Sequence, residues 1–252
     1  MCLLIVASRT IAGTPLLVGA NRDEFLDRPS SPFTVLADDG VRILGGRDEQ
    51  SGGTWLTVNE YGVFAGLTNQ PLGEHKDPTR RSRGELPLAL ATHDTAAAAV
   101  EQFLTRYSPP DYNGCWLLVG DRQSLFYIDF TGLQAPQAVA LPPGLYVLEN
   151  RALGAPSPKA DHVRRALAEF TGEPSVDRDA LVAVLANHEE PEPTSEVPKT
   201  MSNCVHLDHY GTRSTCVIRW TDDDTPPECW VADGPPCVTP LESASALWAE
   251  PR

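Results

Sequence analysis

The sequence has no apolar run long enough to cross a bilayer. Its longest one, Leu3 to Ala7 with Cys2 before it, falls far short of the ~20 residues that a membrane-spanning helix needs. No basic segment precedes this run, as one would in a secretory signal. We therefore expect a cytoplasmic protein with no membrane span.

Basic residues are also scarce. Lys and Arg total 20 against 34 Asp and Glu, which gives a formal net charge of -14. Such a chain repels a nucleic-acid backbone, so nucleic acid is excluded as a partner. The 252 residues are 41% hydrophobic, which is enough to bury a sizeable core. We predict a single domain over residues 1–252.

The cysteines form no Cys-x-x-Cys pair. They are Cys2, Cys115, Cys204, Cys216, Cys229 and Cys237. Without paired ligands we expect no metal site, and in a reduced compartment Cys115, Cys204 and Cys216 are predicted to pack in the core. His206 and His209 lie three apart, which is compatible with a metal or haem axial ligand. We interpret them as ordinary strand-end or surface residues.

Blocks of strands alternate with blocks of helices along the chain. The predicted strands are residues 2–8, 15–20, 54–58, 63–67, 115–119, 124–130, 144–149, 203–207, 215–220 and 228–232. The predicted helices lie within 83–107, broken at His93-Asp94, and over 159–170 and 177–188, the last capped by Ser175 or Asp177. This order favours antiparallel sheets with helices outside them.

Two other segments are predicted to be loops. The polar stretch 189–198 has too few apolar groups to pack, so we expect it to be exposed. The glycine-rich segments 45–48 and 52–53 lack the strand-loop-helix context of a phosphate cradle. We interpret them as a structural loop that covers a pocket.

Cys2 directly follows Met1 and is the main candidate for chemistry. If Met1 is removed, one residue carries both a thiol, with a pKa near ~8.5, and an α-amine, with a pKa near ~7.7–8.0, that can take the thiol's proton. The predicted hairpin 2–20 places Asn21 and Asp23 beside Cys2, where Asp23 would orient the ammonium. Alternatively, Cys2 is a buried strand residue, and Asn21 and Asp23 belong to a solvated turn or an N-cap.

At these residues the sequence resembles the NRDE family, also called the transport-and-Golgi-organisation protein two family. The matching blocks, spread over nearly the whole chain, are Met1-Cys2, Asn21-Arg22-Asp23-Glu24, Gly45-Gly46-Arg47-Asp48, Gly52-Gly53-Thr54-Trp55-Leu56, Asn59, Gly62, Ala65-Gly66-Leu67-Thr68-Asn69, Ser82-Arg83-Gly84-Glu85-Leu86, Leu148-Glu149-Asn150 and Tyr210-Gly211-Thr212-Arg213. Departures from the family pattern are Cys115-Trp116 and residues 152–156. That family is in turn similar to the cysteine N-terminal-nucleophile hydrolases, which include penicillin V acylase and bile salt hydrolase.

The resemblance implies an α+β fold, a four-layer αββα sandwich, and a set of site residues. Cys2 would be the nucleophile, Asp23 the carboxylate that positions the amine, Asn150 an oxyanion donor, Asn69 or Thr68 a second donor, and Arg213 the arginine near the thiol. Asn21, Arg22, Glu24 and Thr68 would contact the substrate. Ala20 stands where the hydrolases have an active-site arginine, and Arg22 follows two positions later.

Two functions follow from the resemblance. The first is a cysteine amidohydrolase or acyl transferase that acts on a small-molecule amide and requires no cofactor. The alternative is a non-catalytic protein that uses the same pocket to bind and move haem, a lipid or acyl-CoA. Each site residue also has a structural alternative: Arg213 as an ion-pair partner, Asn150 as a turn cap and Asn69 as a turn residue.

Overall fold

The first two strands form a hairpin that begins at the second residue of the chain. In this computed structural model β1 spans Cys2–Ile11 and β2 spans Thr14–Phe25, and their antiparallel register pairs Cys2 with Arg22. Gly13 supplies the left-handed backbone of the turn, with φ of 72°. The predicted hairpin is confirmed, although both strands extend further into the expected turn and beyond residue 20.

This hairpin lies in the middle of a six-stranded antiparallel sheet. The order is β10-β1-β2-β11-β12-β13. The other strands are β10 (Gly144–Leu148), β11 (Tyr210–Arg219), β12 (Glu228–Ala232) and β13 (Glu242–Ser243). The strand predicted over 203–207 is wrong, because in the described chain this segment is irregular and makes an isolated bridge between His206 and Gly211.

The second sheet has seven antiparallel strands in the order of the sequence. They are β3 (Ser30–Ala37), β4 (Ile43–Asp48), β5 (Leu56–Asn59), β6 (Phe64–Asn69), β7 (Cys115–Gly120), β8 (Leu125–Phe130) and β9 (Gln137–Ala140). The glycine-rich segment 45–48, predicted to be a loop, is part of β4. Gly45 is needed there because a Cβ would lie 2.5 Å from the carbonyl oxygen of Leu56 on the neighbouring strand.

In the part of the chain that the structure describes, four α-helices cover the outer faces of the sheets. They are α1 (Glu85–Leu90), α2 (Ala96–Arg106), α3 (Pro158–Phe170) and α4 (Arg178–Leu185), with short 3-10 turns at Pro109–Asp111 and Ser245–Ala249. The break predicted at His93-Asp94 is confirmed. Asp177 caps α4 by accepting a hydrogen bond from the Ala180 N–H at 2.8 Å; Ser175 and most of the predicted loop 189–198 lie outside the described residues.

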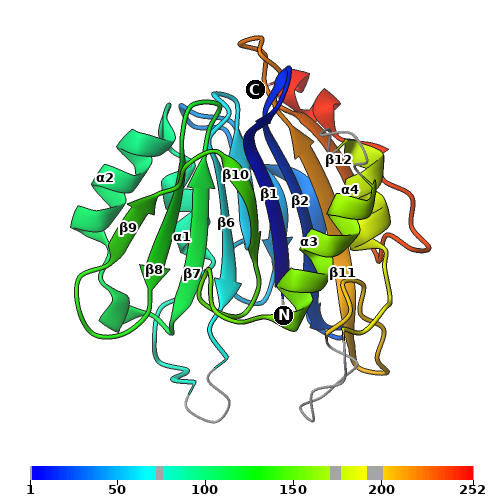
Figure 1. Cartoon of the computed structure of the whole chain (residues 1–252). Coiled ribbons are helices and arrows are strands. Elements are labelled where there is room, and N and C mark those ends of the chain that lie inside the picture. Colours follow the sequence, from blue (N-terminus) through cyan, green and yellow to red (C-terminus); the bar gives the residue numbers. More distant parts are fainter. Residues whose placement is uncertain (1, 72–75, 171–176, 192–200, 252) are drawn as a thin grey trace.

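The layers are therefore helix, sheet, sheet and helix (Figure 1), as the resemblance predicted. One apolar core lies between the sheets, and the other two lie between each sheet and its helices. Residues 2–71, 76–170, 177–191 and 201–251 are described by the structure. No helix within these ranges is long and apolar enough to cross a membrane.

Gly19 sets how closely α4 approaches β2. A Cβ at this position would lie 2.1 Å from Cδ2 of Leu181, which is well inside van der Waals contact. We predict that Gly19→Val lowers the free energy of unfolding by about 1–3 kcal/mol, because α4 must move away from the sheet. Thermal denaturation measures this change as a fall in Tm of roughly 3–10 °C. The control is Gly46→Ala, whose Cβ would lie 3.6 Å from the nearest atom and whose Tm is expected to change little; equal losses for both variants would contradict the packing argument.

Candidate functional site

Cys2 lies at the end of β1, inside the molecule. Its side chain is 7% exposed and lies on the same face of β1 as Leu4 and Val6, which belong to the core between the sheets. Its backbone N–H donates to Oδ1 of Asn150 at 3.1 Å. Asn150 therefore holds the nitrogen that would become the α-amine if Met1 were removed.

The Asn150 amide connects the two sheets at this point. It follows the end of β10, and its Nδ2 donates to the backbone carbonyl of Asn69, at the end of β6, over 2.6 Å. An amide nitrogen carries two hydrogens, so one N–H of Asn150 remains available to a substrate. The structure thus places the Asn150 amide between the Cys2 nitrogen and the backbone carbonyl of Asn69. The side-chain donor role that the resemblance implies for Asn69 or Thr68 stays a prediction.

Asp23 lies on the opposite face of the sheet, beneath α3. Its Oδ1 accepts a hydrogen bond from Thr212 Oγ1 at 2.7 Å, and its Oδ2 is 3.9 Å from Nζ of Lys159. Lys159 is 1% exposed, in the first turn of α3. Burial raises the pKa of the Asp23 carboxyl, and the Lys159 ammonium opposes that rise. The sequence predicted no role for Lys159 or Thr212, although Thr212 belongs to one of the segments that match the family.

Two arginines interact electrostatically with the Cys2 thiol. Burial raises the pKa of this thiol, and the guanidinium of Arg22, its partner across the hairpin, opposes the rise. Arg22 is anchored by Asp48 on β4, whose Oδ2 is 3.3 Å from its Nη2. Arg83 also interacts electrostatically with Cys2, and burial lowers the pKa of Arg83. Arg83 belongs to one of the segments that match the family, but the sequence predicted no role for it.

Arg213 holds the chain where β2 ends. It lies at a bulge in β11 between Thr212 and Ser214, and its guanidinium donates to the backbone carbonyls of Phe25, the last residue of β2, and of Leu26 and Arg28, which follow it. The role near the thiol that the resemblance implies for Arg213 stays a prediction. Arg22 and Arg83 interact electrostatically with Cys2.

Two of the predicted substrate-binding residues also have internal partners. Asn21 is fully buried on the helix side of the sheet, where it donates to the carbonyls of Leu185 and Asn203 and accepts from Thr215 Oγ1. Glu24 Oε2 lies 3.8 Å from Nε of Arg28 and 4.0 Å from Nη2 of Arg22. These contacts give Asn21 a role in fixing β2 and give Glu24 a role in positioning the arginines.

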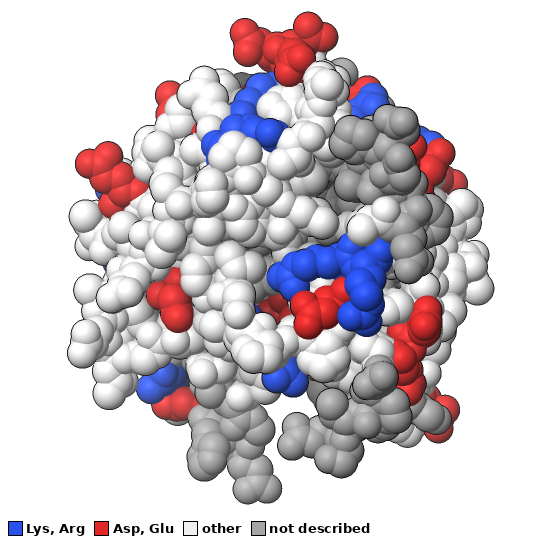
Figure 2. Space-filling view, viewed as in Figure 1, with Lys and Arg blue, Asp and Glu red and all other residues white. Residues whose placement is uncertain are grey.

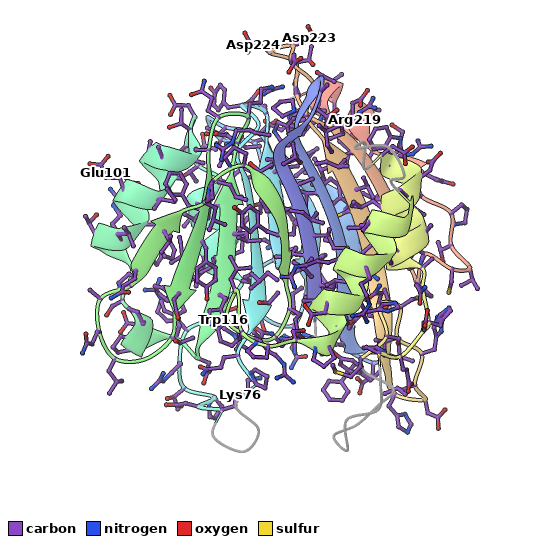
Figure 3. All side chains as sticks on the ribbon, viewed as in Figure 1. Lys76, Glu101, Trp116, Arg219, Asp223 and Asp224 are labelled. Atoms are coloured by element: carbon purple, nitrogen blue, oxygen red, sulfur yellow. The ribbon has the colours of Figure 1, made fainter. Side chains whose placement is uncertain are left out.

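Several buried polar atoms face the space between the sheets without a hydrogen-bond partner in the described chain. Among them are Thr68 Oγ1, Trp116 Nε1 and Arg22 Nη1. Thr68 pairs with Trp116 across β6 and β7, and Figure 3 shows Trp116 near the end of β7 that lies on the same side of the molecule as the chain's N-terminus in Figure 1. Buried donors without partners are costly, so these atoms are candidates to bind a polar ligand group.

A cavity of ≈ 60 Å³ opens between the sheets beside Arg22. Apolar side chains including Phe33, Trp55, Leu56 and Val231 line it, together with Arg22 and Arg47. Cys2 is not among its lining residues, but Arg22, its hairpin partner, is.

Figure 2 shows that, on the face it presents, acidic groups are spread around the rim and a mixed group of both signs lies over α3.

Comparison with known proteins agrees with this architecture. The Transport and Golgi organisation 2 family model matches residues 1–226. The mouse Transport and Golgi organization 2 homolog is 31% identical over 233 residues, and the human homolog is 32% identical over 233 residues; each match covers 81% of both chains.

Solved structures with this fold are more distant in sequence. A Caenorhabditis elegans N-acylethanolamine-hydrolyzing acid amidase ortholog superposes with a TM-score of 0.57 at 15% identity, covering 86% of this chain and 92% of its own. A variant of conjugated bile acid hydrolase from Clostridium perfringens gives 0.55 at 12% identity, covering 100% and 94%. At these identities the likeness concerns the fold alone.

The buried Asp23 carboxyl makes a testable contribution to stability. Because its pKa is raised in the folded state, its contribution is fully present below the unfolded pKa of ~3.9 and is lost as the pH rises through the folded pKa. We predict that Asp23→Asn gains stability relative to the wild type as the pH rises from about 3.5 to 7, measured by urea denaturation. The half-buried Asp77, whose pKa is lowered by hydrogen bonds from Thr79, provides a control of opposite sign: Asp77→Asn should lose relative stability over the same range. The same sign for both variants would refute the assignment.

Arg22 is expected to control the reactivity of the Cys2 thiol. Since its guanidinium favours the thiolate, Arg22→Gln should move the pH dependence of Cys2 alkylation by iodoacetamide to higher pH. Peptide mass spectrometry can follow Cys2 separately from the other thiols. Arg47→Gln is the control, because the side chain of Arg47 is 47% exposed and lies 4.0 Å from Glu49. An unchanged pH profile in Arg22→Gln, with Tm retained, would show that Arg22 does not act on Cys2.

Proposed function

This chain belongs to the Transport and Golgi organisation 2 family, and from that premise we propose that it is a cysteine N-terminal-nucleophile hydrolase that cleaves a small-molecule amide through Cys2. The observation that carries the proposal is the hydrogen bond from the Cys2 nitrogen to Asn150 Oδ1, at 3.1 Å, in a buried position beside two arginines. Acyl transfer requires a nucleophile, a group that positions the nucleophile's amine, and hydrogen-bond donors near the oxyanion.

The reaction begins with removal of Met1, which leaves the Cys2 nitrogen as an α-amine. The amine takes the thiol proton, and the thiolate attacks the amide carbonyl carbon to form a C–S bond. The resulting oxyanion accepts hydrogen bonds from the remaining N–H of Asn150 and from Thr68 Oγ1. When the C–N bond breaks, the leaving amine takes the proton from the α-ammonium and a thioester remains. The α-amine then deprotonates water, which attacks the thioester, and the acid departs as the thiol regains its proton.

The buried carboxylate and the arginines support the attack step in different ways. Asp23 lies close enough to Cys2 to interact with it electrostatically, so it favours the α-ammonium that forms during attack. Arg22 and Arg83 favour the thiolate. Burial alone would hold the Cys2 thiol protonated, so both cations serve the attack step.

Binding of an apolar ligand is the second candidate function. It is favoured by the cavity beside Arg22, where Phe33, Trp55 and Leu56 form an apolar wall and where Arg22 and Arg47 supply two positive charges against the one carboxylate of Asp233. This combination suits an anionic group attached to an apolar body, such as an acyl-CoA, a lipid or haem. At ≈ 60 Å³ the cavity has to widen for any of these, and the exposed Arg47 side chain is able to move.

The nucleophile is tested by Cys2→Ala. With N-acylethanolamines and conjugated bile acids as a first panel of amides, we expect the wild type to release free acid and the variant to lose about 10³-fold or more of that rate. Cys229→Ala, which removes another buried thiol of the core between the sheets, should keep its activity. Intact mass should show that Met1 is absent and that the wild type gains one acyl group on Cys2. Hydrolysis that survives in Cys2→Ala, or a chain that retains Met1 and is still active, would exclude the mechanism.

A further inference from the structure

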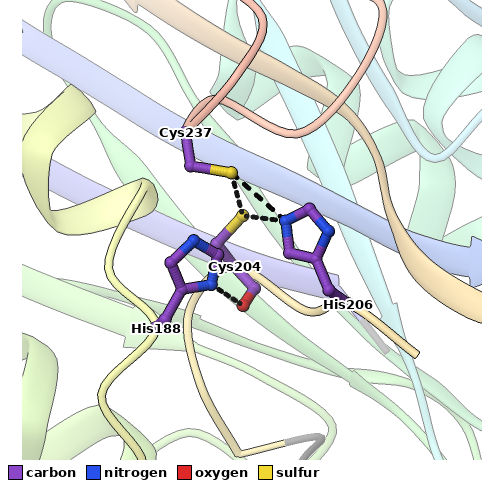
Figure 4. Close-up of side chains that lie close together, drawn as sticks. All are labelled: His188, Cys204, His206 and Cys237. Carbon is purple, nitrogen blue, oxygen red and sulfur yellow. Dashed lines mark hydrogen bonds between the residues drawn. The ribbon is translucent and has the colours of Figure 1, made fainter.

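Four side chains with metal-binding atoms meet away from Cys2, at the side of the six-stranded sheet. They are His188, Cys204, His206 and Cys237, and their ligand atoms all lie within 4.8 Å of one another (Figure 4). Each comes from a segment next to a regular element: His188 follows α4, Cys204 and His206 precede β11, and Cys237 follows β12. We propose that this cluster is a structural zinc site of the Cys₂His₂ type.

The spacing of three of the four ligand atoms fits a tetrahedral ion, and the ligand atom of His188 lies within 4.8 Å of each of them. With Zn–S of about 2.3 Å and Zn–N of about 2.0–2.1 Å, two sulfur ligands lie about 3.8 Å apart and a sulfur and a nitrogen about 3.6 Å apart. Here the two Sγ atoms of Cys204 and Cys237 are 3.7 Å apart, and Nε2 of His206 is 3.5 Å and 3.2 Å from them. A disulfide, by contrast, requires an S–S distance of about 2.03–2.05 Å.

The groups around the cluster also suit a metal site. Nδ1 of His188 lies 3.1 Å from the backbone carbonyl oxygen of Cys204, which leaves Nε2 to face the ion. A histidine ligand usually donates its second ring N–H to a carbonyl in this way, because the bond fixes its tautomer and orientation. Cys204 is itself held by its N–H bond to the Asn187 carbonyl at 2.9 Å and by Ser202 Oγ, which donates to the Cys204 carbonyl at 2.8 Å.

The ligand types select zinc. Two thiolates and two imidazoles in a tetrahedron favour Zn²⁺ over the hard cations Mg²⁺ and Ca²⁺, which prefer oxygen ligands. Four protein ligands fill the coordination sphere, so the ion has a structural and not a catalytic role. Cys204 is buried, whereas His188 and His206 are exposed, so the ion can enter from solvent.

The ion would fasten three parts of the chain that are far apart in sequence. The Cys204 segment is joined to β11 by the Val205 N–H, which donates to Thr212 Oγ1 at 3.0 Å, and by the Thr212 N–H, which donates to the Val205 carbonyl at 2.9 Å. Cys237 brings in the loop after β12. Zinc would therefore hold together the side of the sheet that carries Thr212, the partner of Asp23.

The sequence predicts no metal site, because it contains no Cys-x-x-Cys pair. Only Cys204 and His206 are close in the sequence, while the other two ligands stand 16 residues before and 33 residues after Cys204. The sequence pointed to His206 and His209 as a pair, but the cluster contains His206 and not His209. The proposal is independent of the chemistry at Cys2.

The test is metal binding by the full-length chain under a non-chelating reductant. We expect one zinc ion per chain by elemental analysis, and one bound Co²⁺ that gives tetrahedral d–d bands with thiolate-to-cobalt charge-transfer absorption. Cys237→Ser and His206→Gln should each weaken Zn²⁺ and Co²⁺ binding by at least about tenfold. His209→Gln and Cys2→Ala are the controls and should bind like the wild type. Zinc should also raise the Tm of the wild type more than that of the two ligand variants.

Alkylation of the unmodified protein gives a second measurement that does not depend on variants that fold. Zinc should protect Cys204 and Cys237 from iodoacetamide and leave the labelling of Cys2 unchanged. The proposal is overturned if the wild type binds no zinc or binds Co²⁺ without thiolate absorption, if the ligand variants bind like the wild type, or if Cys204 and Cys237 form a disulfide that resists the reductant and zinc protects neither.

Discussion

The antiparallel register between β1 and β2 is the constraint on which the candidate site depends. This register pairs Cys2 with Arg22, so the start of β1 lies next to the most polar part of β2. β1 has a neighbouring strand on each side, β10 and β2. Alternation along β2 then sends Arg22 toward the core between the sheets and Asn21 and Asp23 toward the helices. A shift of one residue would exchange these faces, and the thiol would lose its cation.

The Asp23–Lys159 pair indicates that this burial serves more than packing. Taking a carboxylate and an ammonium out of water is expensive, and similar apolar residues would often stabilise the fold at least as well. Here the hydrogen bond from Thr212 and the ammonium of Lys159 stabilise the negative charge on Asp23, yet burial still raises the pKa of its carboxyl. Strained electrostatics of this kind concentrate at functional sites. The buried atoms Thr68 Oγ1 and Trp116 Nε1 lead to the same interpretation.

The sequence predicted the architecture well and the site in part. Strand and helix periodicity located most elements, because their apolar residues pack against layers on fixed faces. It missed β3, β4, β9 and β13 and predicted a strand over 203–207 that does not form. In β4 the glycines needed for close strand contact look like a loop in the sequence. Cys2, Asn69 and Asn150 were found because a family pattern orders them along the chain. Arg83 was assigned no role, and of the four cluster residues only His206 was considered as a ligand, since side chains that converge from separate segments leave no regular spacing in the sequence.

The departure at Ala20 can be understood from the same strand geometry. Positions 20 and 22 are two apart on β2, so both face the core between the sheets, about 7 Å from each other along the strand. Ala20 is packed in that core, and Arg22, with its long side chain, lies beside Cys2 on the same face. Arg83, from the segment before α1, acts on the thiol as well. The cation that the resemblance placed at position 20 is thus supplied by two other arginines, and the loss of one arginine does not by itself remove the electrostatic basis for a reactive Cys2.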